Sequence, residues 1–149
     1  MSKVPPSRGA QASRPVSALM ASPAVRHNGE RMATTVLIVD DHDAFRASAR
    51  LLLESEGFEV VGEAADGGSA IEQTTSLAPD LILLDIQLPD IDGFAVASRV
   101  TDAGGAPAVI LISSRDRGDF GPLVKASGAR GFVAKAELSA ESVRALLDG

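Results

Sequence analysis

The apolar residues of this chain fall into short continuous runs, separated by longer segments with helical periodicity. Four runs consist mainly of apolar residues, most of them Val, Ile and Leu, and each is followed by a polar residue that can take part in chemistry. They are Val36–Val39 before Asp40 and Asp41, Leu81–Leu84 before Asp85, Val109–Ile112 before Ser113, and Gly131–Ala134 before Lys135. Such runs, separated by helix-length segments, are typical of parallel strands buried on both faces.

A fifth run, Phe58–Glu63, is less uniformly apolar and suits an edge strand. Helices are predicted between the runs, with Gly57 as a C-cap, Gly67 opening the second helix and Ser139 capping the last. Further helices are expected up to about Asp102 and around Pro122–Ser127. The inward-facing residues are expected to be Phe45, Ala49, Leu52 and Leu53 in the first helix, Ala70, Ile71, Thr74 and Leu77 in the second, and Val143, Leu146 and Leu147 in the last.

Five alternating β and α segments predict an α/β fold, a three-layer sandwich with right-handed crossovers. In an open parallel sheet, ligands bind beyond the carboxyl ends of the strands, where the strand order reverses. Three carboxylates, a hydroxyl and an ammonium gathered there predict a site for a divalent cation and a phosphoryl group.

Composition narrows the classes of function. A length of 149 residues favours one domain with its own core. Cysteine is absent, which excludes disulfides, thiolate catalysis and cysteine-ligated zinc, and fits a reducing cytoplasm. No apolar run approaches the roughly 18 residues of a membrane span.

Charge is unevenly distributed along the chain. Residues 1–33 carry five basic residues against Glu30 alone, a net +4, so the total of −6 leaves −10 on the remainder. We therefore expect no nucleic-acid surface on the folded body.

Residues 1–34, with four prolines and no sustained periodicity, are predicted to be a disordered tail preceding a folded domain at 35–149. A transit peptide, or a translation start at Met32, are the alternatives for this tail.

The set of polar residues at the ends of the first, third, fourth and fifth predicted strands resembles that of the receiver domain of two-component response regulators. These residues are Asp40, Asp41, Asp85, Ser113 and Lys135. The resemblance runs from about Thr35 to Leu147. The local sequences Val-Asp-Asp-His at 39–42, Gly-Phe-Glu-Val-Val-Gly-Glu-Ala at 57–64 and Gly-Ala-Arg-Gly-Phe at 128–132 are similar to those of receivers of the LuxR/NarL type. The resemblance implies a CheY-like, flavodoxin-like doubly wound sandwich with a five-stranded parallel sheet of order 2-1-3-4-5.

The resemblance implies that Asp85 is the phosphoacceptor, with Ser113 and Lys135 neutralising the phosphoryl oxygens. Asp41 and Asp85 suit direct ligation of Mg²⁺, and Asp40 suits ligation directly or through water. The backbone carbonyl of Gln87 is the further ligand that the resemblance implies.

Two more roles come from the resemblance alone. Ser113 and Phe132 occupy switch positions, although Phe132 is equally compatible with ordinary core packing. Gln87 and Arg115 occupy positions that control access of water to the phosphorylated aspartate; we expect Arg115 to shield it.

Structural alternatives stand beside these roles. Asp85 alone would suit a helix N-cap, and Ser114 is a second hydroxyl next to Ser113. Lys135 is either an exposed charge or, with carboxylates nearby, an ion-pair partner. Asp90 and Asp92 are expected to be turn and cap residues. His42 is expected to open the first helix near the acidic site, and we assign it no role.

We expect a Mg²⁺-dependent single-domain response regulator, phosphorylated on Asp85 by a sensor histidine kinase or a histidine phosphotransfer protein, and switching an unknown downstream protein. We expect a signalling phosphoacceptor and not an enzyme. The alternatives are a pseudo-receiver that signals without phosphorylation, a phosphatase or phosphotransferase for small molecules, and a phosphate sink or relay step. The chain is either a stand-alone receiver or a fragment of a larger regulator.

Overall fold

The computed structural model describes residues 33–102, 107–114 and 120–148. Of the predicted tail, only residues 33 and 34 lie within these ranges, so its predicted disorder stays a prediction. Within the described residues, no helix is both long enough and apolar enough to cross a membrane.

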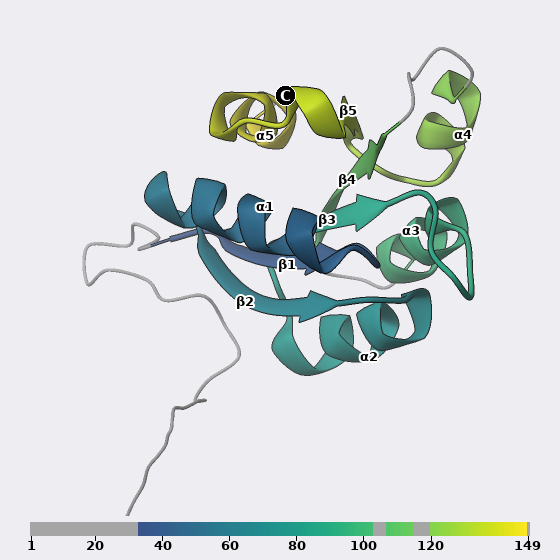
Figure 1. Cartoon of the computed structure of the whole chain (residues 1–149). Coiled ribbons are helices and arrows are strands. Elements are labelled where there is room, and N and C mark those ends of the chain that lie inside the picture. The colour runs from purple at the N-terminus through teal and green to yellow at the C-terminus, as the bar shows by residue number, and fades with distance from the viewer. Residues whose placement is uncertain (1–32, 103–106, 115–119, 149) are drawn as a thin grey trace, which may run out of the picture.

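Five strands alternate with helices along the chain, as the sequence predicted (Figure 1). The strands are β1 (Thr35–Val39), β2 (Glu59–Ala64), β3 (Leu81–Asp85), β4 (Ala108–Ser113) and β5 (Gly131–Ala134). The helices are α1 (Asp43–Ser55), α2 (Gly67–Leu77), α3 (Gly93–Thr101), α4 (Gly121–Ala126), the short 3-10 helix η2 (Lys135–Glu137) and α5 (Ala140–Asp148).

All strand pairs are parallel and the order is β2-β1-β3-β4-β5, which confirms the predicted order 2-1-3-4-5. The chain goes from β1 outward to β2 and then returns past β1 to β3. The carboxyl ends of β1 and β3 therefore flank the point where the winding direction reverses.

Helices cover both faces of the sheet. Successive side chains of a strand point to opposite faces, so each buried strand contributes to the core on both sides. Val36 and Ile38 of β1 pack with α1 and α5, whereas Leu37 and Val39 pack on the side of α2, α3 and α4. Strands β1 and β3 are buried along their whole length, and the edge strand β2 is only partly buried, as predicted. Replacing one of these core leucines by alanine would cost about 2–5 kcal/mol.

The predicted helix boundaries are met to within one or two residues. Gly57 has a φ of +94° and follows the C-cap of α1, where the amide groups of Gly57 and Phe58 donate to the carbonyls of Glu54 and Leu53. This is a Schellman motif, which glycine adopts without strain. At α5, the Ser139 hydroxyl accepts from the Ser142 amide, so the predicted cap is confirmed.

Candidate functional site

The four polar strand ends that the sequence singled out meet at one edge of the sheet. Asp40 and Asp41 follow β1, Asp85 ends β3, Ser113 ends β4 and Lys135 follows β5. Asp85 is paired in register with Ile112, the residue before Ser113, and Ser113 is paired with Ala134, the residue before Lys135. Parallel register thus brings to one place residues that are up to 95 positions apart in the chain.

Lys135 lies between two of the carboxylates. Its Nζ is 2.5 Å from Asp40 Oδ2 and 3.3 Å from Asp85 Oδ2, which confirms the ion-pair interpretation of this lysine. The ring of Phe45, in the first turn of α1, lies 4.6 Å from the same nitrogen and adds a cation–π contact. Burial opposes the charged form, but the bonds with Asp40 and Asp85 outweigh it and raise the pKa of Lys135.

Asp85 is almost fully buried at 2% exposure. Its Oδ1 accepts a hydrogen bond of 3.0 Å from the Gln87 amide, which orients the carboxylate at the start of the β3–α3 loop. Burial, reinforced by the nearby charge of Asp40, raises the pKa of Asp85 despite the Gln87 amide and the Lys135 ammonium. The carboxylate is therefore held where its negative charge is poorly solvated.

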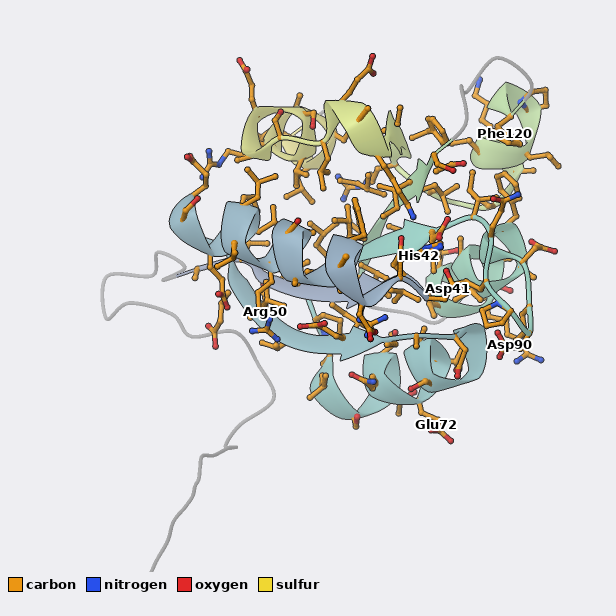
Figure 2. The ribbon with its side chains drawn as sticks, in the orientation of Figure 1. Asp41, His42, Arg50, Glu72, Asp90 and Phe120 are labelled. Carbon is orange, nitrogen blue, oxygen red and sulfur yellow. The ribbon has the colours of Figure 1, made fainter. Side chains whose placement is uncertain are left out.

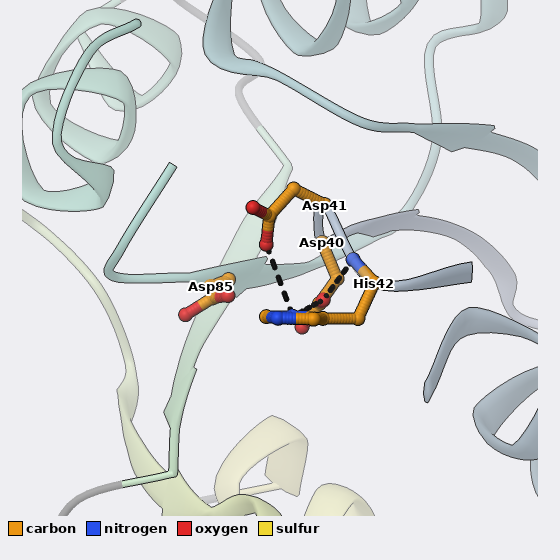
Figure 3. Close-up of side chains that lie close together, drawn as sticks. All are labelled: Asp40, Asp41, His42 and Asp85. Atoms are coloured by element: carbon orange, nitrogen blue, oxygen red, sulfur yellow. Dashed lines mark hydrogen bonds and ion pairs between the residues drawn. The ribbon is translucent and has the colours of Figure 1, made fainter. Parts of the chain in front are cut away.

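The β1–α1 turn contributes three consecutive polar residues (Figure 3). Asp40 is fully buried, whereas Asp41 and His42 have side chains 37% and 69% exposed. Asp40 Oδ1 accepts a 2.8 Å bond from the His42 amide, and His42 Nδ1 lies 3.1 Å from this oxygen and 3.0 Å from Asp41 Oδ1. His42 is also the N-cap residue of α1, as expected, although its side chain makes no cap bond.

These residues fit a divalent cation. One ligand atom from each of Asp40, Asp41, His42 and Asp85 can be chosen so that all four lie within 4.8 Å of one another. Asp40 Oδ2 is buried without a hydrogen bond of good geometry among the described residues, and the Lys135 ammonium contacts it as an ion pair. Three carboxylates lie near a single ammonium, which pairs with Asp40 and Asp85, so they leave an excess of negative charge that a cation would neutralise.

Two arginines of α1 connect the β1–α1 turn and the helix to the edge strand β2. Arg46 donates to the Asp40 carbonyl and, over 3.0 Å, to Glu63 of β2. Arg50 donates to the other oxygen of Glu63 over 2.8 Å. The arginines tie α1 and the end of β1 to the edge strand, so the turn that carries the carboxylates is braced on both sides.

The β3–α3 loop is braced in a similar way through Asp90, whose side chain is labelled in Figure 2. Asp90 accepts from the amides of Gly67 and Gly68 at the start of α2, and these bonds lower the pKa of Asp90. Asp92 caps α3 through the Ala95 amide, so both aspartates are the turn and cap residues that were predicted. A Cβ at Gly93 would lie 2.3 Å from the Asp85 carbonyl oxygen, so only glycine lets α3 begin this close to Asp85.

The remaining predicted residues differ in what the structure says of them. Ser113 is buried at the carboxyl end of β4. Phe132 is buried and its ring lies 5.8 Å from that of Phe120, which in turn contacts Phe94, so its core interpretation is confirmed and its switch role stays a prediction. Arg115 lies outside the described residues, so its shielding role also stays a prediction.

Three contributors to the site were missed by sequence reasoning. His42 was noticed but given no role, Phe45 was expected only to face the core from the first helix, and Arg46 was not singled out. The available signal was position: all three lie within six residues of Asp40, in the turn that enters α1. No local pattern shows that Phe45 meets Lys135, because β5 brings that lysine from the far end of the domain.

The model of the response regulator receiver domain family matches residues 36–147. This chain belongs to that family. The predicted family and the flavodoxin-like fold are both confirmed, and receiver domains bind Mg²⁺ at an acidic pocket of the kind found at the end of β1 and β3.

Curated relatives include transcription regulators. The chain is 37% identical over 114 residues to BvgA of Bordetella pertussis, named a positive transcription regulator of virulence factors, covering 76% of this chain and 54% of BvgA. It is 31% identical over 101 residues to the DNA-binding transcriptional activator EvgA of Escherichia coli, covering 68% and 50%. The chain thus spans about half the length of the curated relatives it matches.

Solved structures of response regulators also resemble this chain in fold and sequence. A receiver domain assigned to the response regulator NarL of Mycobacterium tuberculosis is 38% identical with a TM-score of 0.70, covering 78% of this chain and 94% of that one. A LuxR-family two-component response regulator from an Aurantimonas species is 30% identical with a TM-score of 0.71, covering 78% and 84%.

Proposed function

We propose that this receiver accepts a phosphoryl group on Asp85 in a Mg²⁺-dependent reaction and thereby switches the binding of a downstream protein. The observation that carries the proposal is the placement of Asp85: a buried carboxylate beside a second carboxylate and an ammonium. A strand-end aspartate that served only as a helix cap would accept from amides and need no lysine. Asp92, in the loop just before α3, shows such a cap: its side chain accepts from the Ala95 amide.

The reaction is a phosphoryl transfer between two side chains. An Asp85 oxygen attacks the phosphorus of a phosphohistidine, the P–O bond forms, the P–N bond breaks, and the leaving imidazole takes up a proton. The product is an aspartyl phosphate, whose formation depends mainly on positioning and on neutralising the phosphoryl oxygens. Lys135 and Ser113 are the residues at this edge that supply positive charge and a hydroxyl.

Asp40, Asp41 and Asp85 are the residues that would hold the metal, with the Gln87 carbonyl as a further oxygen ligand. Mg²⁺ prefers oxygen ligands and usually combines one or two carboxylates with water and phosphate oxygens. When bound, the ion neutralises charge on the transferring group. Arg46, by holding the carbonyl of Asp40, keeps the β1–α1 turn in the position from which its carboxylates face Asp85.

Partners follow from this chemistry. The donor is a sensor histidine kinase or a histidine phosphotransfer protein, and the chain acts as a phosphoacceptor and not as an enzyme with a released product of its own. Phosphorylation shifts an equilibrium between two states of the domain and so changes binding of a partner. That the described residues themselves bind no nucleic acid stays a prediction from their acidic charge.

Phosphorylation by a small phosphodonor tests the proposal. The protein is incubated with acetyl phosphate and Mg²⁺, and its intact mass is measured. We expect a gain of one phosphoryl group that is absent in Asp85→Asn and absent when EDTA is added. Asp43→Asn is the matched control, because Asp43 is the aspartate that begins α1, its side chain is 92% exposed, and it forms an ion pair with Arg46 and not with the residues of the site.

Two outcomes would contradict the proposal. A wild-type protein that gains no phosphoryl group from acetyl phosphate or from a histidine donor would be a pseudo-receiver. A gain that persists in Asp85→Asn would place the phosphoryl group on another side chain.

A further inference from the structure

The imidazole of His42 is directed at the carboxylates of the site. Its Nδ1 lies 3.0 Å from Asp41 Oδ1 and 3.1 Å from Asp40 Oδ1, although the ring as a whole is 69% exposed (Figure 3). The His42 amide also donates to Asp40 Oδ1. The ring is therefore fixed at the mouth of the acidic pocket, with one nitrogen turned inward.

The separations among these atoms suit ligands of one ion. Two neighbouring ligands of an octahedral ion, each about 2.1 Å from the metal, lie about 3.0 Å apart. A hydrogen bond has a similar length, but one Nδ1–H can point at only one of the two carboxylates. A cation among these atoms contacts both carboxylates and the nitrogen together.

Burial at the floor of the pocket supplies an independent indication. Asp40 is fully buried, and its Oδ2 has no hydrogen bond of good geometry among the described residues. The charge of this carboxylate is shared between Lys135 on one side and the His42 edge on the other. Lys135 is shared with Asp85, so the carboxylates of the pocket that His42 borders keep an excess of negative charge, which favours a cation there.

Imidazole changes which cation is preferred. Mg²⁺ favours oxygen ligands, and a nitrogen ligand adds little to its affinity. Divalent transition ions such as Zn²⁺ accept imidazole readily, and the affinity of a site for these ions follows the Irving–Williams order, in which Mn²⁺ is lowest and Co²⁺ is higher. A pocket of three aspartates and one histidine therefore ranks these ions differently from a pocket of aspartates alone.

We propose that His42 is a metal ligand that makes this pocket bind divalent transition ions of the Mn²⁺, Co²⁺ and Zn²⁺ class more tightly than Mg²⁺. The proposal uses the pocket named under the proposed function and rests on its carboxylates binding a cation. It assigns to His42 the selectivity between ions, a property separate from phosphorylation.

Titration calorimetry with Mg²⁺ and with Co²⁺ tests the proposal on the full chain. The variant is His42→Asn, because asparagine is also a good N-cap residue and keeps a polar side chain without the imidazole. The control is His27→Asn, which changes the other of the two histidines in the chain. We expect His42→Asn to lose about tenfold or more in Co²⁺ affinity and less than about twofold in Mg²⁺ affinity, with His27→Asn unchanged.

A spectroscopic readout accompanies the affinities. Bound Co²⁺ absorbs visible light according to its ligands, so loss of a nitrogen ligand should shift and weaken the band in His42→Asn but not in His27→Asn. Equal losses for both ions, or an unchanged Co²⁺ affinity and spectrum, would overturn the proposal. If His42→Asn fails to fold by circular dichroism, His42→Gln replaces it under the same criteria.

Failure of the proposed function is recognised separately. Mg²⁺-dependent phosphorylation of the wild type from acetyl phosphate, read by intact mass, reports on the function and does not involve Co²⁺. If the protein is phosphorylated but its Co²⁺ affinity does not change in His42→Asn, only the role of His42 as a metal ligand is refuted. A protein that is never phosphorylated, yet loses Co²⁺ binding in His42→Asn, refutes only the function.

Discussion

Strands β1 and β3 carry polar residues at both ends, and the two ends are built on opposite principles. At the amino ends, Asp80 Oδ2 accepts from the Thr35 amide and hydroxyl at 2.9 and 3.1 Å, and the Thr35 hydroxyl accepts from the Asp80 amide at 2.9 Å. At the carboxyl ends, three carboxylates lie near one ammonium, that of Lys135, which forms ion pairs with Asp40 and Asp85. A buried oxygen of Asp40 lacks a hydrogen bond of good geometry among the described residues.

The comparison separates two uses of a carboxylate at the end of a strand. Where donors match acceptors, as with Thr35 and Asp80, the carboxylate stabilises the fold and has little affinity for anything else. Where carboxylates outnumber cations, as at Asp40 and Asp85, the pocket is held in place by the rest of the fold and gains free energy when a cation arrives. Removing a carboxylate should therefore destabilise the protein at the amino end and stabilise the metal-free protein at the carboxyl end, whereas removing the Lys135 ammonium should destabilise it.

The largest effect is expected from Lys135→Met, which removes the ammonium from the carboxyl end. Breaking a buried pair by removing one partner leaves an uncompensated charge, here on Asp40, so the free energy of unfolding should fall by about 3 kcal/mol. Added Mg²⁺ should restore part of the loss by replacing the lost positive charge. Urea unfolding followed by circular dichroism measures this, since the chain has no Trp or Tyr.

Lys125→Met is the control for that experiment, because Lys125 lies exposed on α4 and a surface change of this kind is usually worth less than about 0.5 kcal/mol. If Lys135→Met is no more destabilising than Lys125→Met, the excess of negative charge at the carboxyl end is not felt by the fold.

Next in size is Asp80→Ala, at the amino end. It leaves the Thr35 amide and hydroxyl, which are buried, without their carboxylate, so we expect a loss of about 2–3 kcal/mol. Asp80→Asn, which keeps an acceptor oxygen, should lose less. Phosphorylation by acetyl phosphate should be unchanged in folded Asp80→Ala. A fall in the extent of phosphorylation at equal foldedness would show that the two ends are coupled.

Asp85→Asn should have the opposite sign and stabilise the metal-free protein by about 1 kcal/mol at neutral pH. Burial, and then the charge of Asp40, raise the pKa of Asp85, so its ionised form destabilises the folded state. Its folded pKa is above its unfolded pKa, so the penalty is complete above the folded pKa and disappears as the pH falls through it to the unfolded value. Urea midpoints of the two proteins should converge on acidification; a wild type more stable than Asp85→Asn at neutral pH contradicts the comparison.

The smallest effect is expected from Glu63→Gln. Glu63 lies near the carboxyl end of β2, but its carboxylate has matched donors in Arg46 and Arg50, so it separates the effect of position from the effect of matched partners. Hydrogen bonds from Arg50 and, against burial, from Arg46 lower the pKa of Glu63. The stabilisation is present above the unfolded pKa and is lost as the pH falls through the folded value. We expect a loss of about 0.5–1 kcal/mol at neutral pH that vanishes in acid.

Unfolding midpoints across this pH range measure the Glu63 effect, with Glu72→Gln, an exposed glutamate of α2, as the control. A stabilised Glu63→Gln would mean that position at the carboxyl edge matters more than the match between donors and acceptors.

The sequence by itself determined the strands, the helices and their caps. Gly57, Asp92 and Ser139 act within a few residues of their own position, and the uniformly apolar runs ending at Val39 and Leu84 require burial on both faces. The resemblance supplied the strand order, which no local pattern contains. Convergence of Asp40, Asp85, Ser113 and Lys135 then follows from parallel strands ending at one edge.

Only the tertiary structure decided the partners across that edge. Sequence reasoning placed Lys135 among carboxylates, but not the close approach of Asp40 or the Phe45 ring over its ammonium. It assigned Asp90 to a turn, but not to the amides of α2, and it left His42 without a role. The physical reason is that caps and periodicity depend on neighbours within about one helical turn, whereas these contacts depend on strand register and on how each helix packs over the sheet.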